Sequence, residues 1–167
     1  QTGKGDLGAA GMTAREDRKK MVDFSINYVD TGLYILVGIN NDVIKTGDDL
    51  AGKSIGVQLG TTSDLFASDI EGATVQRYKT APDAVAQLAN GAIDAVVVDE
   101  LPAKDAVANN STAIKMLDEP LTVEQYAIAI AKEDTDLKEV VDKVLQKMLD
   151  DGTVEQLIAK HMELSAQ

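Results

Sequence analysis

The sequence predicts an α/β fold with parallel-rich sheets, and three observations support this prediction. From Lys53 to Asn110, short apolar runs alternate with segments of helical spacing, which is typical of βαβ units around a parallel sheet. The run Ile93–Val98 is almost continuously apolar, as expected of a strand whose two faces are both covered. Towards the C-terminus, apolar residues recur from Leu137 to Met148 at the spacing of an amphipathic helix.

The early elements are predicted to be short. Leu7–Met12 is apolar and rich in glycine and predicts a buried strand, and the polar residues 13–20 after it could form one helical turn. Extended structure is predicted at 22–25 and at 33–37, the second of which is rich in β-formers. Residues 48–52 predict a helical turn that ends at a glycine.

Regular alternation of strands and helices is predicted from Lys53 onward. Thr80 is expected to cap one of these helices, because Pro82 and Asp83 suit the first turn that follows it. Strands are predicted at 54–58, 74–78, 93–98, 114–117 and 126–130, and helices at 60–70, 80–91 and 99–110.

Two further helices are predicted to close the chain. Asp136 with Glu139 predicts a capping box at the start of the first helix, and Gly152 predicts its end. Thr153 with Gln156 predicts a second capping box. The apolar face of the first helix comprises Leu137, Val140, Val141, Val144, Leu145 and Met148.

The composition excludes several classes of protein. The 167 residues carry 16 Lys+Arg against 28 Asp+Glu, and this net charge of −12 argues against a nucleic-acid partner. No apolar run approaches the ~20 residues that a membrane span needs, and the first residues carry no apolar segment of a signal peptide. The absence of cysteine and the single His161 argue against a thiolate metal site, a multi-histidine metal site and a Ser-His-Asp triad. We therefore expect no metal, no cofactor and no catalytic residues.

Polar clusters follow predicted strands at their carboxyl ends, where open parallel sheets bind ligands. The clusters are Gly11–Thr13 with Arg18, Gly60–Thr62, and Asp99. Free backbone amides suit an anion, a guanidinium can hold a carboxylate, and a carboxylate can accept from an ammonium. Together these groups are complementary to a zwitterion, a small molecule that carries both a carboxylate and an amine.

The order of the motifs along the chain carries a resemblance to a known family. The first motifs are Gly11–Thr13, Arg18, Val22–Ser25 and Tyr28–Gly32. The later ones are Leu50–Thr62, Ala92–Asp99, Glu124–Ala129 and Gly152–Thr153. In this order the sequence resembles the polar amino-acid family of bacterial extracellular solute-binding proteins, the ligand-capturing subunits of ABC importers. The resemblance covers essentially the whole chain, and the combined order is highly specific although each motif alone is weak.

The resemblance implies a two-lobed, periplasmic-binding-protein-like (type II) fold that closes like a clamshell around its ligand. Lobe one would comprise residues 1–35 and 122–167, and lobe two would comprise residues 36–121. Two crossover strands would form the hinge between the lobes.

The resemblance also implies roles for residues of both lobes. The family positions that hold the ligand α-carboxylate match Gly11, Thr13 and Arg18, and a threonine stretch that matches Thr61 and Thr62 helps from the other lobe. The position that takes the α-amine matches Asp99, and Gln58 lies where family members often contact the ligand side chain.

The implied function is the capture of a polar or basic L-amino acid, as a free zwitterion, and its delivery to an ABC permease. No bond is made or broken, so the protein is expected not to be an enzyme. It would lie in the periplasm, or outside the cell on a lipid anchor, and its precursor would carry a signal peptide. The sequence does not say which amino acid is bound.

Several alternatives stay open. The chain could be an extracytoplasmic amino-acid sensor domain, or an enzyme of the same fold that dehydrates cyclic acids, with Asp99 or Glu100 as acid or base. Thr61 and Thr62 could merely cap a helix, and so could Asp99. Arg15 competes with Arg18, which we favour because it lies five residues after Thr13.

The sequence departs from the family at its start, because family members carry further strands and a helix of lobe one before this point. We therefore expect lobe one to be incomplete and an apolar patch on the first closing helix to be partly exposed. We further expect the chain to be homodimeric or complexed, and to bind its ligand weakly by itself. The residues expected to be partly exposed are Val140, Val144, Leu145 and Met148.

Overall fold

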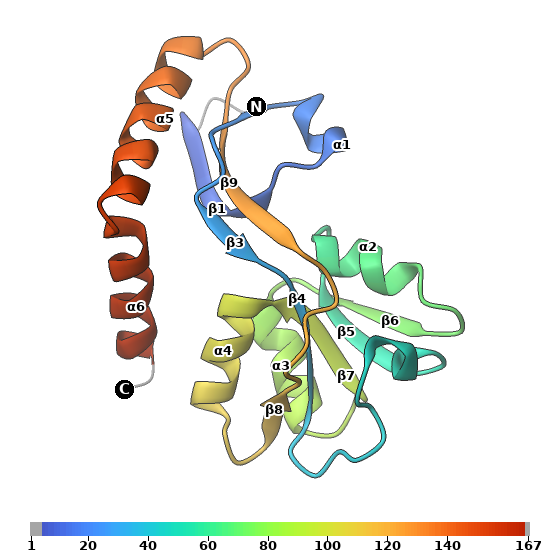
Figure 1. Ribbon diagram of the computed structural model, residues 1–167. Coiled ribbons are helices and arrows are strands. Elements are labelled where there is room, and N and C mark those ends of the chain that lie inside the picture. The colour runs from blue at the N-terminus through green and yellow to red at the C-terminus, as the bar shows by residue number, and fades with distance from the viewer. Residues whose placement is uncertain (1–4, 166–167) are drawn as a thin grey trace. The chain divides into compact units, whose positions relative to one another are not determined.

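The computed structural model describes residues 5–165, which form two compact units (Figure 1). Unit 1 contains the chain up to Thr31 together with Glu124–Leu164, and unit 2 is built on Gly32–Val123. Strand β4, Leu33–Gly38, lies entirely in unit 2, whereas the lobe boundary expected after residue 35 would cut through it.

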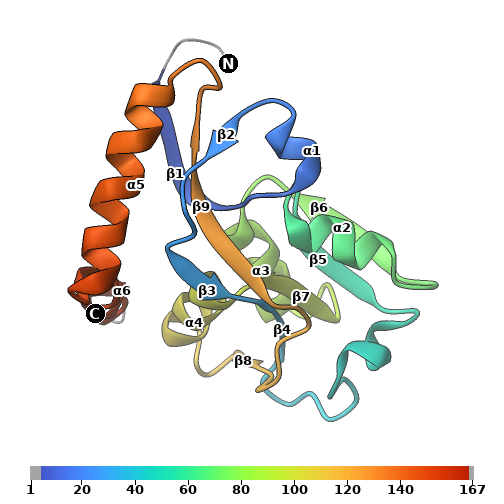
Figure 2. The same ribbon diagram turned by 45° about the horizontal axis from the view of Figure 1, so that its top comes forward.

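Unit 1 is built around strand β9, Glu124–Ile130. One partner of β9 is strand β1, Leu7–Thr13, and different stretches of β9 pair with β2, Asp23–Phe24, and β3, Val29–Thr31. Figure 2 shows β9 running between β1 and β2. All of these pairings are antiparallel, so the expectation of a parallel-rich sheet is wrong for unit 1.

Strand β1 forms where it was predicted, but it is not buried. It lies at the edge of the sheet, and Leu7 is 47% exposed. An edge strand has a neighbour on one side only, which leaves its apolar side chains less covered than those of a central strand. The buried apolar residues of unit 1 come from β2, from β9 and from the closing helices; they are Phe24, Tyr126, Ala127, Ile130, Leu145 and Val154.

The two closing helices are confirmed, but both predicted capping boxes are wrong. Helix α5, Thr135–Asp150, has Asp134 as its N-cap, so Asp136 lies inside the first turn instead of capping it. Helix α6, Thr153–Ser165, already includes Thr153, whose amide donates to Asp151 Oδ1 at 3.0 Å. Gly152 adopts a φ of +75° between the helices, which is the left-handed conformation expected of a glycine that ends a helix.

The apolar face of α5 is only partly covered. Leu145 is 7% exposed, whereas Val140 and Val144 are 58% and 51% exposed. The expected exposure is thus confirmed for the two valines and wrong for Leu145. Association of this chain with a second copy stays a prediction, which light scattering of the purified chain can test.

Unit 2 is a five-stranded sheet in the order β6-β5-β7-β4-β8. The three strands β5, Ser54–Gln58, β6, Thr74–Tyr78, and β7, Ala95–Asp99, are parallel to one another, as predicted. Strand β4 is antiparallel both to β7 and to β8, Ile114–Met116, so the sheet is mixed rather than purely parallel.

Helices cover both faces of this sheet. Helix α2, Thr62–Ser68, and the 3-10 helix η1, Gly47–Leu50, contribute to one buried cluster, and helices α3, Ala81–Ala89, and α4, Glu100–Asn109, contribute to the other. Successive side chains of a strand point to opposite faces, so the first cluster takes Ala95 and Val97 of β7 and the second takes Val96 and Val98. This explains why residues 95–98 of the predicted strand are all apolar.

The predicted start of α3 is confirmed. The Thr80 hydroxyl accepts from the Asp83 amide at 3.3 Å, and the Asp83 carboxylate accepts from the Thr80 amide at 3.2 Å. Pro82 lies in the first turn, where its missing N–H has no helical partner to lose. Within the described residues, none of the helices combines the length and the apolar character required to span a bilayer.

Candidate functional site

Unit 1 places Gly11, Thr13 and Arg18 at the end of β1. Thr13 is the last residue of the strand, and Arg18 lies in the short helix α1, Glu16–Lys19. Arg18 Nη1 donates to the Thr13 carbonyl oxygen at 3.1 Å, and both residues are partly buried. The guanidinium is therefore held beside the strand end, as the zwitterion hypothesis requires.

Gly11 shapes the backbone of this strand end. Its φ of +56° is left-handed, and the β1–β9 register shifts between Gly8 and Met12. A Cβ on Gly11 would lie 3.3 Å from Cζ of Tyr126. Burial raises the pKa of Tyr28, while a hydrogen bond with the Gly11 backbone acts in the opposite direction. Both tyrosines thus lie against the backbone of this strand end.

The structure distinguishes Arg15 from Arg18. Arg15 Nε and Nη2 donate to the two carboxylate oxygens of Asp17 at 3.0 and 2.9 Å, a bidentate ion pair. This hydrogen-bonded pair raises the pKa of Arg15 and lowers the pKa of Asp17 to about 2. Arg15 is thus paired with an exposed carboxylate of helix α1, whereas Arg18 is held against the Thr13 carbonyl oxygen at the end of β1.

Glu124 contacts the predicted site residue Thr13, and the sequence does not predict this contact. The Thr13 hydroxyl donates to Glu124 Oε2 at 2.6 Å, across 111 positions of sequence. A hydroxyl has one proton, so the Thr13 hydroxyl here donates to Glu124 rather than towards a ligand. Glu124 lies in one of the motifs that carry the family resemblance, but nothing in the sequence pairs it with Thr13.

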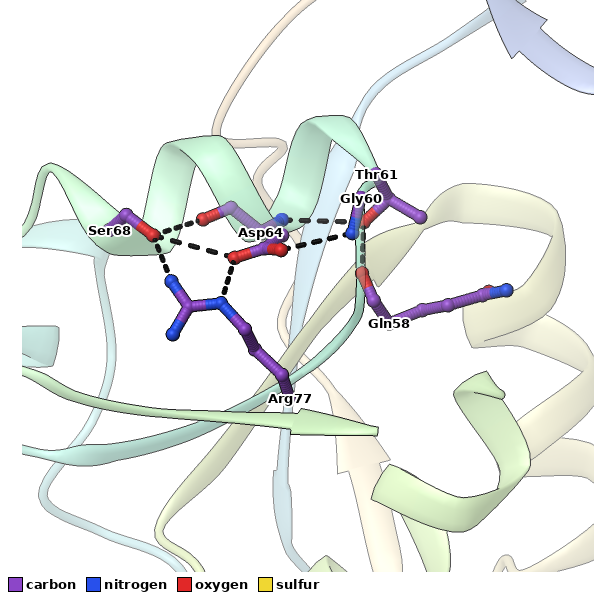
Figure 3. Close-up of polar contacts among 6 residues, drawn as sticks. All are labelled: Gln58, Gly60, Thr61, Asp64, Ser68 and Arg77. Carbon is purple, nitrogen blue, oxygen red and sulfur yellow. Dashed lines mark hydrogen bonds and ion pairs between the residues drawn. The ribbon is translucent and has the colours of Figure 1, made fainter. Parts of the chain in front are cut away.

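Unit 2 places Gln58, Thr61 and Thr62 on the loop from β5 to α2 (Figure 3). The Thr61 hydroxyl donates to the Gln58 carbonyl oxygen at 2.8 Å and accepts from the Asp64 amide at 3.3 Å. The capping interpretation is therefore confirmed for the Thr61 side chain. Thr62 takes no part in this cap, and the exposed side chain of Gln58 extends away from the network.

Asp99 ends strand β7, opposite Leu33 of β4, and is partly buried. It occupies the N-cap position of α4, but its side chain makes no capping hydrogen bond, so the capping interpretation of Asp99 is wrong. Ile55 of β5 is level with Ala95 of β7, and the register continued along the sheet brings Asp99 level with Leu59. Asp99 and the Gln58–Thr62 loop therefore share the carboxyl edge of the parallel strands.

Each unit thus presents part of the predicted chemistry. Unit 1 offers a guanidinium, and unit 2 offers a carboxylate together with a loop of hydroxyls and amides. Among residues 5–165, no group of three or more His, Asp or Glu side chains could hold a metal ion.

Comparison with known proteins identifies relatives along the chain. The family model of bacterial extracellular solute-binding proteins, family 3, matches residues 1–163. The L-cystine-binding protein TcyJ of Escherichia coli (strain K12) is 34% identical over 151 residues, which cover 89% of this chain and 57% of the relative. A probable histidine-binding protein of Campylobacter jejuni is 36% identical over 163 residues, which cover 96% of this chain and 63% of the relative.

Solved structures share the fold. A mutant of ArgBP from T. maritima is 42% identical with a TM-score of 0.88, over 95% of this chain and 69% of that one. The ancestral amino acid-binding protein AncCDT-1, described as a precursor of cyclohexadienyl dehydratase, is 36% identical with a TM-score of 0.86, over 96% of this chain and 70% of that one. The chain spans about 60% of the length of the two curated relatives. Because the family model matches residues 1–163, the chain belongs to the bacterial extracellular solute-binding proteins, family 3.

Proposed function

We propose that this chain binds a free amino acid, with Arg18 of unit 1 holding the α-carboxylate and Asp99 of unit 2 holding the α-amine. The observation that carries the proposal is the family match over residues 1–163, which includes all seven site positions. The position of Arg18 beside Thr13, and of Asp99 beside the Gln58–Thr62 loop, supports it. Opposite charges on the two units would recognise the two ends of one zwitterion.

The ligand class and the biological setting belong to the same proposal. The named relatives bind cystine, histidine or other amino acids, which supports a polar or basic L-amino acid as the ligand. These relatives are binding proteins and not enzymes, so we propose no reaction for this chain. The family name supports a place outside the cytoplasm, either periplasmic or lipid-anchored, with an ABC permease as the recipient.

Two-dimensional ¹⁵N–¹H NMR of the labelled chain tests the proposal even when binding is weak. Each of the twenty L-amino acids is added at about 10 mM. Even binding with a Kd in the millimolar range then shifts the amide signals of the residues that contact the ligand. We expect one group of polar or basic amino acids to shift Thr13, Arg18, Thr62 and Asp99 together. If no amino acid shifts these signals, the proposed function of the chain is wrong.

Substitution of Arg18 by alanine should strongly reduce these shifts. A hydrogen bond to a charged group contributes about 1.5–3 kcal/mol, so loss of the guanidinium should weaken binding roughly tenfold or more. Lys19→Ala is the matched control, because Lys19 carries the same charge on the same turn, is exposed and pairs with Glu16. Titration of both variants with the best ligand, followed by NMR, checks the prediction. Equal affinities of the two variants would show that Arg18 does not bind the ligand carboxylate.

A further inference from the structure

A charged network centred on one buried carboxylate lies behind the proposed ligand loop, and the proposed function does not use it. Its centre is Asp64 of α2, which is only 7% exposed, and its other members are Ser68 of α2 and Arg77 of β6 (Figure 3). We propose that Asp64 is a positioning residue, which fixes the Gly60–Thr62 backbone in the conformation that meets the ligand. This inference rests on the proposed function, because it concerns the same loop.

The two carboxylate oxygens of Asp64 have different partners. Oδ2 accepts from the Gly60 amide at 2.9 Å, and Oδ1 accepts from Arg77 Nε at 2.8 Å. One oxygen thus holds the backbone of the loop, and the other is anchored to the neighbouring strand. The side chain links the loop to the sheet through a single rigid group.

Ser68 and Arg77 hold the carboxylate in place. Arg77 Nη2 donates to Ser68 Oγ at 2.8 Å, and Ser68 Oγ donates its proton to the Asp64 carbonyl oxygen at 2.7 Å. Arg77 therefore contacts both Asp64 and Ser68, and its side chain is 43% exposed against 10% for Asp64. The pair is buried on the Asp64 side only, where the carboxylate faces the loop.

The network leaves the loop little freedom. Gly60 adopts a φ of +78°, and its amide is tied to Asp64 Oδ2. Thr61 is tied through its hydroxyl to the Gln58 carbonyl oxygen and to the Asp64 amide. Thr62 follows these two fixed residues directly, so its backbone and side chain start from a defined position. A ligand that contacts Thr62 would then bind a loop that needs no ordering.

Asp64→Asn distinguishes the anchoring of the Gly60–Thr62 backbone by the carboxylate from a contribution of Asp64 to packing alone. An asparagine has nearly the same shape, but its amide has one accepting oxygen and a donating nitrogen. If the oxygen faces Arg77, the nitrogen meets the Gly60 N–H, and if the oxygen faces Gly60, the nitrogen meets the guanidinium. In either orientation one of the two contacts is lost, although the volume is kept.

Asp94→Asn is the matched control. Asp94 is also a carboxylate of unit 2 that holds the backbone of β5, because its Oδ2 accepts from the amide and the hydroxyl of Ser54 at 2.8 and 2.6 Å. Ser54 begins β5, whereas Gln58 ends it, so this contact lies at the opposite end of the strand from the loop. Asparagine keeps one oxygen that can accept both Ser54 contacts but loses the negative charge, so Asp94→Asn should weaken this contact and lower stability without altering the loop.

The test combines ligand titration with a double-mutant cycle. For the amino acid that binds the unmodified chain best, we expect Asp64→Asn to raise the Kd about tenfold and Asp94→Asn to leave it unchanged. Each Kd is measured at the same interval below the thermal midpoint of unfolding of that variant. Asp64→Asn and Thr62→Val should be non-additive, because both act on the same contact. The ligand-free amide signals of Gly60 and Thr61 should shift in Asp64→Asn only.

The possible failures are distinguishable. An unmodified chain that binds no amino acid contradicts the proposed function, while the ligand-free Gly60 signal still reports whether Asp64 anchors the loop. An unmodified chain that binds, together with an Asp64→Asn variant of equal affinity, overturns the positioning role alone. Full additivity with Thr62→Val overturns it as well, because it would show that Asp64 does not act through Thr62.

Discussion

Replacement of Asp99 by asparagine is expected to abolish amino-acid binding. In the proposed site Asp99 accepts from the α-ammonium of the ligand, and removal of one partner of a buried charge pair costs about 3–5 kcal/mol. Asparagine keeps the shape at the end of β7 but removes the charge. A loss of this size raises the Kd by roughly two to four orders of magnitude, so the amide shifts caused by the ligand should disappear.

Asp105→Asn is the matched control for this experiment. Asp105 is a partly buried carboxylate on α4, one turn and a half beyond Asp99, and it interacts with Asn109 of the same helix. We expect this variant to bind like the unmodified chain. An Asp99→Asn variant that retains binding would exclude the ammonium contact and with it the assignment of a zwitterion.

The fold of unit 2 could be predicted well because its elements carry local signals. The parallel strands are short apolar runs between turns, and Thr80 caps α3 as the sequence indicates. The direction of β4 could not be predicted in the same way. Its neighbours β7 and β8 come much later in the sequence, so the pairing depends on how the chain crosses the sheet.

In unit 1 the same reasoning was less successful. The glycine-rich run at 7–12 is apolar enough for a central strand, but its position at the edge of the sheet depends on β9, more than a hundred residues later. The start of α5 differs from the prediction because Asp134 takes the N-cap position that Asp136 was expected to occupy. At α6, Thr153 lies inside the helix and its amide donates to Asp151, two residues earlier. Several acceptable caps in succession cannot be ranked from sequence spacing alone.

The sequence predicts those candidate site residues that match the family motifs. It does not predict the residues that only hold such a residue in place. Thr13 and Arg18 lie together as expected, because only four residues separate them. Glu124 and Asp64 were missed, since the first contacts a residue 111 positions away and the second is bound to Arg77, 13 positions away on another strand. Acidic residues are frequent in this chain, so composition does not single out these two.

Substitution of Gly32 by alanine should destabilise unit 2 strongly. A Cβ on Gly32 would lie 2.2 Å from the Thr122 carbonyl oxygen and 3.2 Å from Cβ of Pro120. The first contact is with backbone, which cannot rotate away as a side chain can. Accommodation of the methyl group therefore requires the segments 32–33 and 120–122 to separate.

Separation would break the hydrogen bonds that join these segments. The Leu33 amide donates to Thr122 Oγ1 at 3.1 Å, and the Leu121 amide donates to the Leu33 carbonyl oxygen at 2.7 Å. Overpacking costs about 1–3 kcal/mol and each lost hydrogen bond about 0.5–1.5 kcal/mol, so we expect a loss of about 3 kcal/mol in the free energy of unfolding. Against the about 5–15 kcal/mol of an ordinary domain, this loss would be large.

Gly38→Ala is the matched control, because Gly38 ends β4, the strand that begins directly after Gly32, and a Cβ there has no atom within 4 Å. No left-handed φ is required at Gly38 either, so alanine there should be neutral or slightly stabilising. Urea unfolding of both variants, followed by circular dichroism, measures the difference in midpoint. Equal midpoints would mean that the 32–33 and 120–122 segments can separate at little cost, and that their close approach contributes little to the stability of the unit.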